Sequence, residues 1–321
     1  MPDIQHKKLH LGLWDLLFKV LDEGSISRAA RQYNLERSQV SRMLSTLEFE
    51  VGTPLLERNG KRVEATQAAL IARKKIEPLI RDMEHALSDI RDDRNAYSGN
   101  IRFGAMPGFL QTQVVPLIAE FQQHHPNISF DVIGDDDPKS FMHGQCDLML
   151  YYGPVNDNRL IEHWVSRSAF IPCASPEYIA SHGSPKDPSE LIEHAGVIYT
   201  GNVRPHSAFL RRYGKEETFR WKSQIRFNNI LLTKAAVLEG CGIGLDIPLH
   251  HCIDDIIEGR LIPILDGWHI PNLDNYIGTT LEAGRLKRVQ TFIDWYIEKR
   301  RGIEGEQKRR VRERYPFLSF D

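Results

Sequence analysis

Polar residues with hydrogen-bonding side chains recur at helical spacing between residues 37 and 47, where they alternate with an apolar stripe. A helix over this segment has one buried face and one exposed face. Arginine and serine can donate to base edges and to phosphate, so the exposed face suits the DNA major groove. The apolar stripe consists of Val40, Leu44 and Leu47, and the exposed face consists of Ser38, Ser41, Arg42 and Ser45.

A shorter helix is expected immediately before this one. Ser25 is a suitable N-cap residue for it. Ala29 and Ala30 fall in its middle, where small side chains let a second helix cross closely. Asn34 then tolerates the unusual backbone angles of a tight turn. The two segments together predict a helix-turn-helix.

Two short strand-like segments follow, at residues 55–58 and 61–64, and Asn59-Gly60 lies between them. Asn-Gly between two strands is a hairpin signal, so we expect a wing. Arg58, Lys61 and Arg62 give its tip positive charge for phosphate or for the minor groove. Thr66 is the expected cap of the next helix.

Charge supports a DNA partner only locally. The whole chain has 321 residues and a formal net charge of −2. From Arg28 to Lys75, however, there are ten basic and five acidic residues, a local charge of +5. A local patch matters more than the global sum when phosphate is the partner.

A charged segment over residues 67–94 predicts one long helix with an apolar heptad seam. We expect the seam to pair with a copy of itself and make a dimer; the alternative is a single helix lying on its own domain. Pro78 weakens the seam locally. The seam residues are Ile76, Ile80, Met83, Leu87 and Ile90.

These N-terminal residues resemble those of LysR-type transcriptional regulators. The similarity rests on Gly24-Ser25-Ile26-Ser27-Arg28-Ala29-Ala30, Gln39-Val40-Ser41-Arg42, Leu47-Glu48, Val51-Gly52-Thr53-Pro54-Leu55-Leu56-Glu57-Arg58 and Thr66. It extends more weakly to about Lys299. The resemblance implies a dimer, often assembled as a tetramer, on promoter DNA, together with a small-molecule effector. The predicted DNA contacts are Ser25, Ser27, Arg28, Arg37, Ser38, Gln39, Ser41, Arg42, Ser45, Arg58, Lys61 and Arg62.

The implied fold class is α/β with an N-terminal all-α winged helix-turn-helix, a linker helix and a two-lobed, type 2 periplasmic-binding-protein-like effector domain. The expected domains are residues 1–66 for DNA binding, 67–95 for the linker and dimerisation helix, and 96–299 for effector binding. Lobe 1 is expected at 96–161 and 267–299, lobe 2 at 162–266, and a basic extension at 300–321.

Two positions depart from the usual family pattern. Glu36 stands where Ser or Thr commonly starts the recognition helix, and Arg37-Ser38 replaces the common Gln-Pro. A carboxylate suits the helix dipole there but repels phosphate. We therefore expect an operator other than the commonest family consensus.

The region after residue 95 alternates strands and helices. A strand at 101–104, a helix at 113–124, a strand at 128–132, a helix near 139–144 and a strand at 147–151 predict a parallel sheet. The chain is expected to cross to the second lobe near 160–164 and to return near 265–274. Residues 173–178 resemble the entry segment of the second lobe, and residues 239–244 its glycine-rich turn facing the cleft.

Effector contacts are expected at strand ends, where ligands of open α/β sheets bind. The first of these segments is apolar, which favours a partly hydrophobic or aromatic effector over a small acid; the alternative is a cleft filled by its own side chains. By resemblance, the contacts are Met106, Pro107, Gly108, Phe109, Gly134, Asp135, Thr200, Gly201, Asn202, Asn228, Asn229, Ile230 and Gly242.

Other chemistries are less favoured. The His143–Cys146 and His250–Cys252 segments lack structural zinc spacing, so we expect no metal and no cofactor. Cys241 is expected to be a small buried cysteine rather than a reactive thiol. No Ser or Cys nucleophile motif is present, so an enzyme is not expected.

The chain has neither an apolar leader nor a run long enough to span a membrane, which favours the cytoplasm, in association with the nucleoid. The basic residues from 300 to 321 are expected to be a solvated, partly disordered extension; alternatives are added DNA contact or an arm between subunits. We interpret the chain as a regulator whose promoter binding is modulated by an effector in a cleft. The alternative is a cytoplasmic small-molecule binding protein without a DNA role.

Overall fold

The computed structural model describes residues 11–59, 62–92, 97–134, 146–202, 208–318 and 320. The chain divides into two compact units, Met1–Asp93 and Arg94–Asp321. The hairpin tip at Gly60 and Lys61, the residue Asp135 and the helix expected near 139–144 lie outside the described residues. No helix among the described residues is long and apolar enough to cross a membrane.

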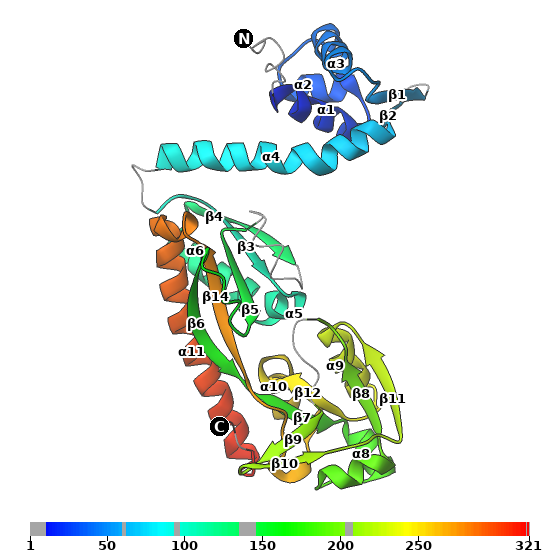
Figure 1. Ribbon diagram of the computed structural model, residues 1–321, viewed down its shortest axis with the longest axis vertical. Coiled ribbons are helices and arrows are strands. Elements are labelled where there is room, and N and C mark those ends of the chain that lie inside the picture. The colour runs from blue at the N-terminus through cyan, green and yellow to red at the C-terminus, as the bar shows by residue number, and fades with distance from the viewer. Residues whose placement is uncertain are drawn as a thin grey trace. The chain divides into compact units, whose positions relative to one another are not determined.

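The first unit is a winged helix-turn-helix followed by a long helix (Figure 1). Its core is formed by apolar residues from every helix, including Leu17, Ala29, Val40 and Leu47. The elements are α1 (Leu11–Glu23), α2 (Ile26–Gln32), α3 (Arg37–Val51), β1 (Leu56–Asn59), β2 (Arg62–Ala65) and α4 (Gln67–Asp92).

The predicted turn at Asn34 and the predicted cap at Thr66 are present in this unit. Asn34 between α2 and α3 has φ of 52°, the left-handed conformation that asparagine tolerates. Gly52 ends α3 with φ of 76°, as is usual for a residue that terminates a helix. Thr66 Oγ1 accepts from Ala69 N at 3.2 Å and so caps α4.

The wing is joined to the helices by two groups of hydrogen bonds. Glu48 Oε1 on α3 accepts from Leu55 N at 2.7 Å and from Leu56 N at 3.0 Å. Val63 N of β2 donates to Gly24 O at 3.2 Å. The wing is thereby held against α3 and the start of α2.

The second unit has two α/β lobes (Figure 1). Lobe 1 is built on a five-stranded sheet of order β4-β3-β5-β14-β6, in which β3, β4 and β5 are parallel and β14 runs antiparallel to its neighbours. Its elements are β3 (Gly99–Ala105), α5 (Pro107–Phe109), a π-helical turn (Leu110–Val114), α6 (Val115–His124), β4 (Ile128–Gly134), β5 (Leu148–Tyr152), β6 (Leu160–Ser168), β14 (Leu273–Thr280), a 3₁₀ turn (Ala283–Arg285) and α11 (Lys287–Arg314).

Lobe 2 joins a β12-β7-β13 sheet to the parallel pair β11-β8 through a bridge between Gly196 and Ile243. A separate antiparallel hairpin, β9-β10, lies beside it. The elements are β7 (Phe170–Ala174), α8 (Pro176–His182), a 3₁₀ helix (Pro188–Glu193), β8 (Ala195–Tyr199), β9 (Phe209–Arg212), β10 (Lys215–Thr218), β11 (Ser223–Phe227), α9 (Ile230–Leu238), β12 (Gly244–Pro248), α10 (Leu249–Glu258), β13 (Ile262–Pro263) and a 3₁₀ turn (Leu265–Gly267).

The crossing between the lobes falls later than the sequence suggested. β6 stays paired with β14 until Ser168 opposite Leu273, and β7 begins at Phe170. The chain therefore enters lobe 2 near residue 169 and returns through the segment before Leu273. Residues 173–178 are the end of β7, the N-cap Ser175 and the start of α8, within lobe 2 as predicted.

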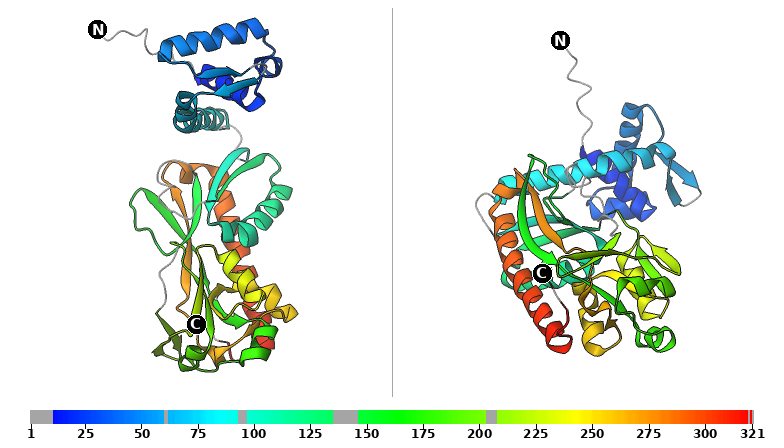
Figure 2. Two further views of the ribbon diagram at one scale, coloured as in Figure 1. Left: turned by 90° about the vertical axis from the view of Figure 1, so that its right-hand side faces the viewer. Right: turned by 60° about the horizontal axis from the view of Figure 1, so that its bottom comes forward.

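The C-terminal residues contradict the expectation of a solvated extension. α11 continues without a break to Arg314, and Val311, Leu318 and Phe320 are buried in the core of lobe 2. Two views in Figure 2 follow α11 from lobe 1 to lobe 2. The basic composition concealed these apolar positions, because they are few and widely spaced.

Candidate DNA interface and effector cleft

The predicted recognition helix is α3, and its two faces are divided as the spacing requires. Val40, Leu44 and Leu47 are buried in the first unit. The opposite face is open to solvent except for Ser41, which is half-buried; its exposed members include Arg37, Ser38, Arg42 and Ser45. This face can supply hydrogen-bond donors to the edges of bases.

The start of α3 is stabilised by a side chain that was predicted to contact DNA. Gln39 Oε1 accepts from Glu36 N at 2.9 Å, which is one arm of a capping box. The amide oxygen of Gln39 is therefore engaged within the helix, and its amide nitrogen remains the group that can donate to DNA. Glu36 itself has an extended backbone as the N-cap residue.

The three predicted contacts around α2 differ in their surroundings. Ser25 is the N-cap residue of α2, although its side chain makes no capping hydrogen bond. Ser27 is exposed. Arg28 is exposed but donates to the Glu23 carbonyl oxygen and forms an ion pair of 3.5 Å with the Glu23 carboxylate. Binding phosphate through Arg28 requires this pair to rearrange.

The wing carries two of the predicted basic contacts on its paired strands. Arg58 pairs with Val63 and Asn59 with Arg62 in the antiparallel ladder of β1 and β2. This pairing places both arginine backbones next to the tip of the hairpin. Lys61, the third basic residue predicted here, lies outside the described residues.

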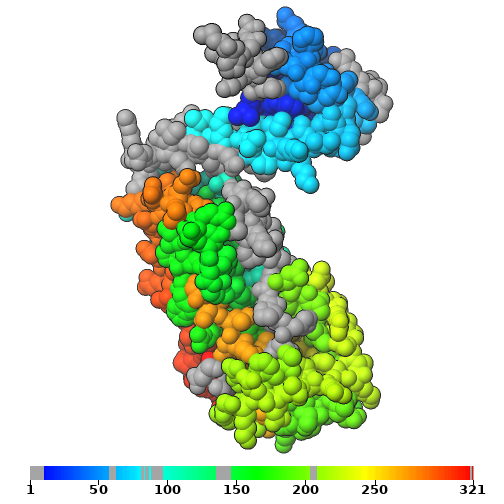
Figure 3. Space-filling view, in the orientation of Figure 1, coloured from blue at the N-terminus to red at the C-terminus, as the bar shows by residue number. Residues whose placement is uncertain are grey.

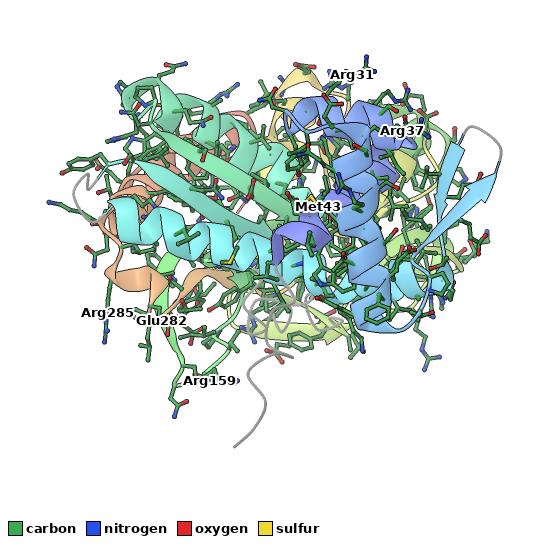
Figure 4. All side chains as sticks on the ribbon, turned by 90° about the horizontal axis from the view of Figure 1, so that it is seen from above. Arg31, Arg37, Met43, Arg159, Glu282 and Arg285 are labelled. Carbon is green, nitrogen blue, oxygen red and sulfur yellow. The ribbon has the colours of Figure 1, made fainter. Side chains whose placement is uncertain are left out.

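An additional cation lies near the recognition helix. Arg31, in the last turn of α2, is exposed, and Figure 4 shows it on the same side of the helix pair as Arg37 at the start of α3. The local charge count included Arg31, but the motif did not single it out. Its position makes it a candidate for contact with the DNA backbone.

The second candidate site is a pocket between the lobes of the second unit. Its cavity volume is about 30 Å³, so a ligand larger than water can enter only when the lobes move apart. Lobe 1 contributes the start of α5 and the end of β5, and lobe 2 contributes the ends of β8 and β12 and the segments that begin α9 and α10. The lining residues are Met106, Pro107, Gly108, Phe109, Tyr152, Tyr199, Asn228, Asn229, Ile230, Pro248 and His251.

Aromatic rings form much of the wall of this pocket. The ring of Phe109 lies 4.8 Å from that of Tyr152 and 5.3 Å from that of His250. His251 Nδ1 lies 3.4 Å from Thr112 Oγ1 across the lobe boundary. Burial, the largest cause, together with repulsion from His251 and Arg300, lowers the pKa of His250 well below its ordinary value. His250 is therefore neutral beside the pocket.

The segment Met106–Phe109 starts a helix and is not a loop. Met106 is the N-cap residue and Pro107 occupies the first turn, where its fixed φ is favourable. The missing Cβ of Gly108 allows a close approach between the lobes. A methyl group there would meet His251 Nε2 and Ile230 Cγ2, each at 2.8 Å.

Several residues expected in the cleft do not line this pocket. Gly134 lies beside Leu110, and Gly201 lies against the ring of Tyr199. Both glycines are therefore next to the pocket but do not line it. Thr200 N donates to Phe227 O at 2.7 Å, and Asn202 is exposed. Asp135 lies outside the described residues.

Gly242 belongs to a different part of lobe 2. A Cβ there would meet Ala195 O at 2.5 Å, at the start of β8, whereas Tyr199 of the pocket ends that strand. The glycine-rich turn therefore packs against the sheet, and Gly242 is not a lining residue of the pocket. A side chain at this position is excluded by the φ of 154° and by the close approach of Ala195 O, which explains why residue 242 is a glycine.

Four lining residues were not predicted: Tyr152, Tyr199, Pro248 and His251. Tyr152 and Tyr199 end strands, so a rule that extended each candidate segment to the preceding strand residue would have found Tyr199. Pro248 and His251 come from the junction of β12 and α10, for which the sequence carries no cleft signal.

The cysteine prediction was wrong, because Cys241 is exposed in the turn between α9 and β12. Among the residues that the structure describes, no group of three or more His, Cys, Asp or Glu side chains could hold a metal ion.

Two family models match the chain. The bacterial regulatory helix-turn-helix model of the lysR family matches residues 11–70, and the LysR substrate binding domain matches residues 94–301. These two matches agree with the predicted domain order, in which a DNA-binding helix-turn-helix precedes an effector-binding domain.

Individual relatives carry matching names. The HTH-type transcriptional regulator YhjC of Escherichia coli (strain K12) is 27% identical over 282 residues, covering 87% of this chain and 94% of the relative. CrgA of Neisseria meningitidis serogroup B, also named an HTH-type transcriptional regulator, is 27% identical over 290 residues, covering 87% and 93%.

Two solved full-length structures are similar in fold. AphB, described as a Vibrio cholerae virulence activator and a member of the LTTR family, has a TM-score of 0.58 at 23% identity, covering 90% of this chain and 99% of that one. CrgA, a LysR-type transcriptional regulator from Neisseria meningitidis, has a TM-score of 0.57 at 24% identity, covering 90% and 98%.

Proposed function

Because this chain belongs to the LysR family of bacterial transcriptional regulators, we propose a role for each of its two candidate sites. The helix α3 and the wing read promoter DNA, and the pocket between the lobes takes a partly apolar or aromatic effector. Family membership makes the chain a DNA-binding regulator with an effector domain, not an enzyme. The residues that contact DNA and effector are our proposal.

The exposed face of α3 is the observation that carries the DNA part of this proposal. Arg42 lies in the middle of that face, and its Nε donates only a long bond of 3.4 Å to Ser38 O one turn earlier. The side chain can leave this bond at small cost and donate to a base edge instead.

Substitution of Arg42 tests this assignment. Arg42→Ala should weaken binding to the DNA upstream of its own gene by about 1–3 kcal/mol, and it should relax sequence preference. Quantitative gel shifts at fixed salt measure both effects. Arg310→Ala removes another exposed arginine, on α11, and serves as the control. Unchanged affinity and preference in Arg42→Ala would exclude this register of the helix.

The lining of the pocket supports the effector class. Phe109, Tyr152 and Tyr199 offer flat apolar surface, and none of the described lining residues carries a fixed positive charge. Asn229 Oδ1 already accepts from Leu231 N at 2.8 Å and caps α9. The polar side chain of Asn228 also lines the pocket and can orient a polar group of the ligand. This balance favours an aromatic or partly apolar molecule.

A ligand screen with a blocked pocket tests the site. Small aromatic acids, amides and phenols should raise the melting temperature of the unaltered chain more than aliphatic acids do, because bound ligand stabilises the folded state. Gly108→Ala should abolish the increase by filling the lobe boundary. Gly12→Ala is the matched control, since nothing lies within 4 Å of its added methyl. Equal stabilisation of both variants would move the ligand elsewhere.

We also propose that the chain forms a homodimer through α4, or a homotetramer made of two such dimers. Ile76 and Ile80 of the seam pack on the core of their own unit. Met83 and Leu87, farther along, are 39% and 43% exposed and can meet a second copy. A DNA-binding role supports a cytoplasmic location at the nucleoid, where promoter DNA lies.

A further inference from the structure

α11 is anchored in lobe 1 by its first half. Val289, Phe292, Ile293 and Tyr296 are buried in the core around the five-stranded sheet. The match to the LysR substrate binding domain ends at residue 301, just after this anchor. The residues that follow therefore add something to the matched domain.

The end of the chain is anchored equally firmly in lobe 2. Val311, Leu318 and Phe320 are buried in one cluster with Ile253 and Ile256 of α10. Arg314 donates to the carbonyl oxygen of Ile257, and Phe320 O accepts from Asn272 Nδ2 at 3.2 Å. In Figure 3 the red residues of α11 lie along one edge of the molecule, beside both lobes.

Between these anchors, α11 contacts the strand on which the chain leaves lobe 1. Arg301 donates to Val165 O at 2.9 Å and to Trp164 O at 3.0 Å, and its guanidinium lies 4.7 Å from the Trp164 ring centre. Lys308 Nζ donates to Arg167 O at 3.1 Å. All three acceptors belong to β6, immediately before the crossing.

The middle of α11 contains two glycines, which lower its intrinsic helix stability. Gly302 and Gly305 lie inside the helix with nothing near the position of a Cβ. Glycine lowers helix stability because its backbone has the most freedom to lose. No other described helix of eight or more residues has a glycine after its first turn.

Polar groups surround this glycine pair. Glu304, which is 7% exposed, pairs with Lys308 at 2.6 Å and with Arg300 at 3.7 Å. A small cavity beside them, bounded also by Ser168 and Ala169 at the crossing, leaves Arg300 Nε, Glu304 Oε2, Gln307 Oε1 and His250 Nε2 buried without a hydrogen-bond partner. Buried polar groups stabilise a junction less than close apolar packing does.

We propose that the residues from 300 to 320 form a strap that ties lobe 2 to lobe 1 and limits the angle between the lobes, with Gly302 and Gly305 as its compliant point. Firm apolar anchors at both ends and a softened centre at the crossing are what such a tether requires. The pocket is formed by both lobes, so the strap also limits its width.

The charges of the strap argue against DNA as its partner. Arg309 pairs with Glu306 and Glu313, and Lys308 with Glu304. The guanidinium of Arg312 lies 5.3 Å from the ring centre of Phe320. Most of its basic residues are thus engaged within the strap itself.

The lobe angle can be measured without any ligand, so the test does not depend on the proposed effector. Nitroxide labels at Ala119→Cys on α6 and Tyr213→Cys on the β9-β10 turn report the distance between lobes by pulsed electron spin resonance. Both positions are exposed, Cys241→Ser removes the exposed cysteine, and the other three cysteines are buried. The full chain is diluted with unlabelled protein, so that only distances within one copy are measured.

Two double variants should change the distance distribution in opposite directions. Arg301→Ala with Lys308→Ala removes the contacts with β6 and should roughly double the width of the distribution. Gly302→Ala with Gly305→Ala strengthens the helix without a clash and should narrow it. Ile303→Ala, exposed on the same helix, should leave the width unchanged.

A width that stays unchanged in either double variant overturns the proposal, and so does a change of the same sign in both. Far-ultraviolet circular dichroism and the melting temperature check that each variant is folded. If the Arg301 and Lys308 variant does not fold, the glycine variant decides alone: an unaltered width then excludes a strap that limits the lobe angle.

Discussion

At the scale of single residues, the neutral state of His250 has a measurable consequence. Its ring is buried between Phe109 and His251 at the lobe boundary, and burial lowers its pKa well below the ordinary value of 6.5. In the unfolded chain the ring takes up a proton below about pH 6.5, but in the folded chain it does not. The unfolded state therefore binds more protons at low pH.

The free energy of unfolding should consequently fall as the pH decreases below 6.5, by at most about 1.4 kcal/mol per pH unit from this group. Denaturant unfolding at a series of pH values from about 7.5 to about 5.5, within the range in which histidine titrates, measures this pH dependence of the unfolding free energy. His250→Phe should reduce the slope, whereas the exposed His124→Gln serves as control. An identical slope in the His250 and His124 variants would remove His250 from the explanation.

The exposed face of α3 was predictable from the sequence, because burial of Val40, Leu44 and Leu47 fixes which side chains face outward. The pocket was only partly predictable. Met106–Phe109 and Asn228–Ile230 follow strands, so the sequence indicates them, but His251 reaches the pocket from α10. Such a residue depends on how two lobes meet, and nothing local in the sequence encodes that.

At the scale of elements, Glu48 connects the recognition helix to the wing. Its carboxylate accepts from two consecutive backbone amides, Leu55 N and Leu56 N. Removal of the acceptor leaves these donors without their partner, which costs about 1–3 kcal/mol when such groups are buried. Leu55 is buried and Leu56 half-buried, so the cost applies.

Glu48→Ala should therefore loosen the wing while the helices remain folded. Hydrogen exchange of peptides covering residues 52–66 should become faster, and affinity for DNA should fall. Glu50→Ala removes an exposed carboxylate two residues away on α3 and should change neither. If both variants exchanged at the same rate, Glu48 would not be what holds the wing.

The elements themselves followed from sequence patterns where one face is apolar. α2, α3, the wing and α4 were expected from caps, turns and periodicity, and the structure agrees. α11 was read incorrectly beyond residue 299. Its buried residues there include Arg300 and Glu304. Charged residues such as these are normally expected on the surface, and these two are buried because they pair with each other.

At the scale of the whole molecule, assembly depends on the part of α4 that its own unit does not cover. Met83→Glu with Leu87→Glu should shift the chain from dimer to monomer, because charges on an apolar helix seam repel and must be desolvated. Sedimentation velocity over a range of concentrations measures the change.

Leu70→Glu is the matched control, since Leu70 is exposed on the same helix but lies outside the seam. The dimer variant should also lose affinity for a site with two half-sites more than for a single half-site. Dimers that persist in the Met83 and Leu87 variant would assign the contact to another surface.

The packing of Val311, Leu318 and Phe320 in lobe 2 also bears on the order of events during synthesis. Residues 170 to 263, which supply the strands of that lobe, leave the ribosome before these three side chains do. The first unit can complete its core early, as N-terminal domains generally do, whereas lobe 2 must wait with Ile253 and Ile256 uncovered. A premature stop codon close to residue 311 would therefore act as a folding mutation of lobe 2 and not as a harmless trimming of the tail.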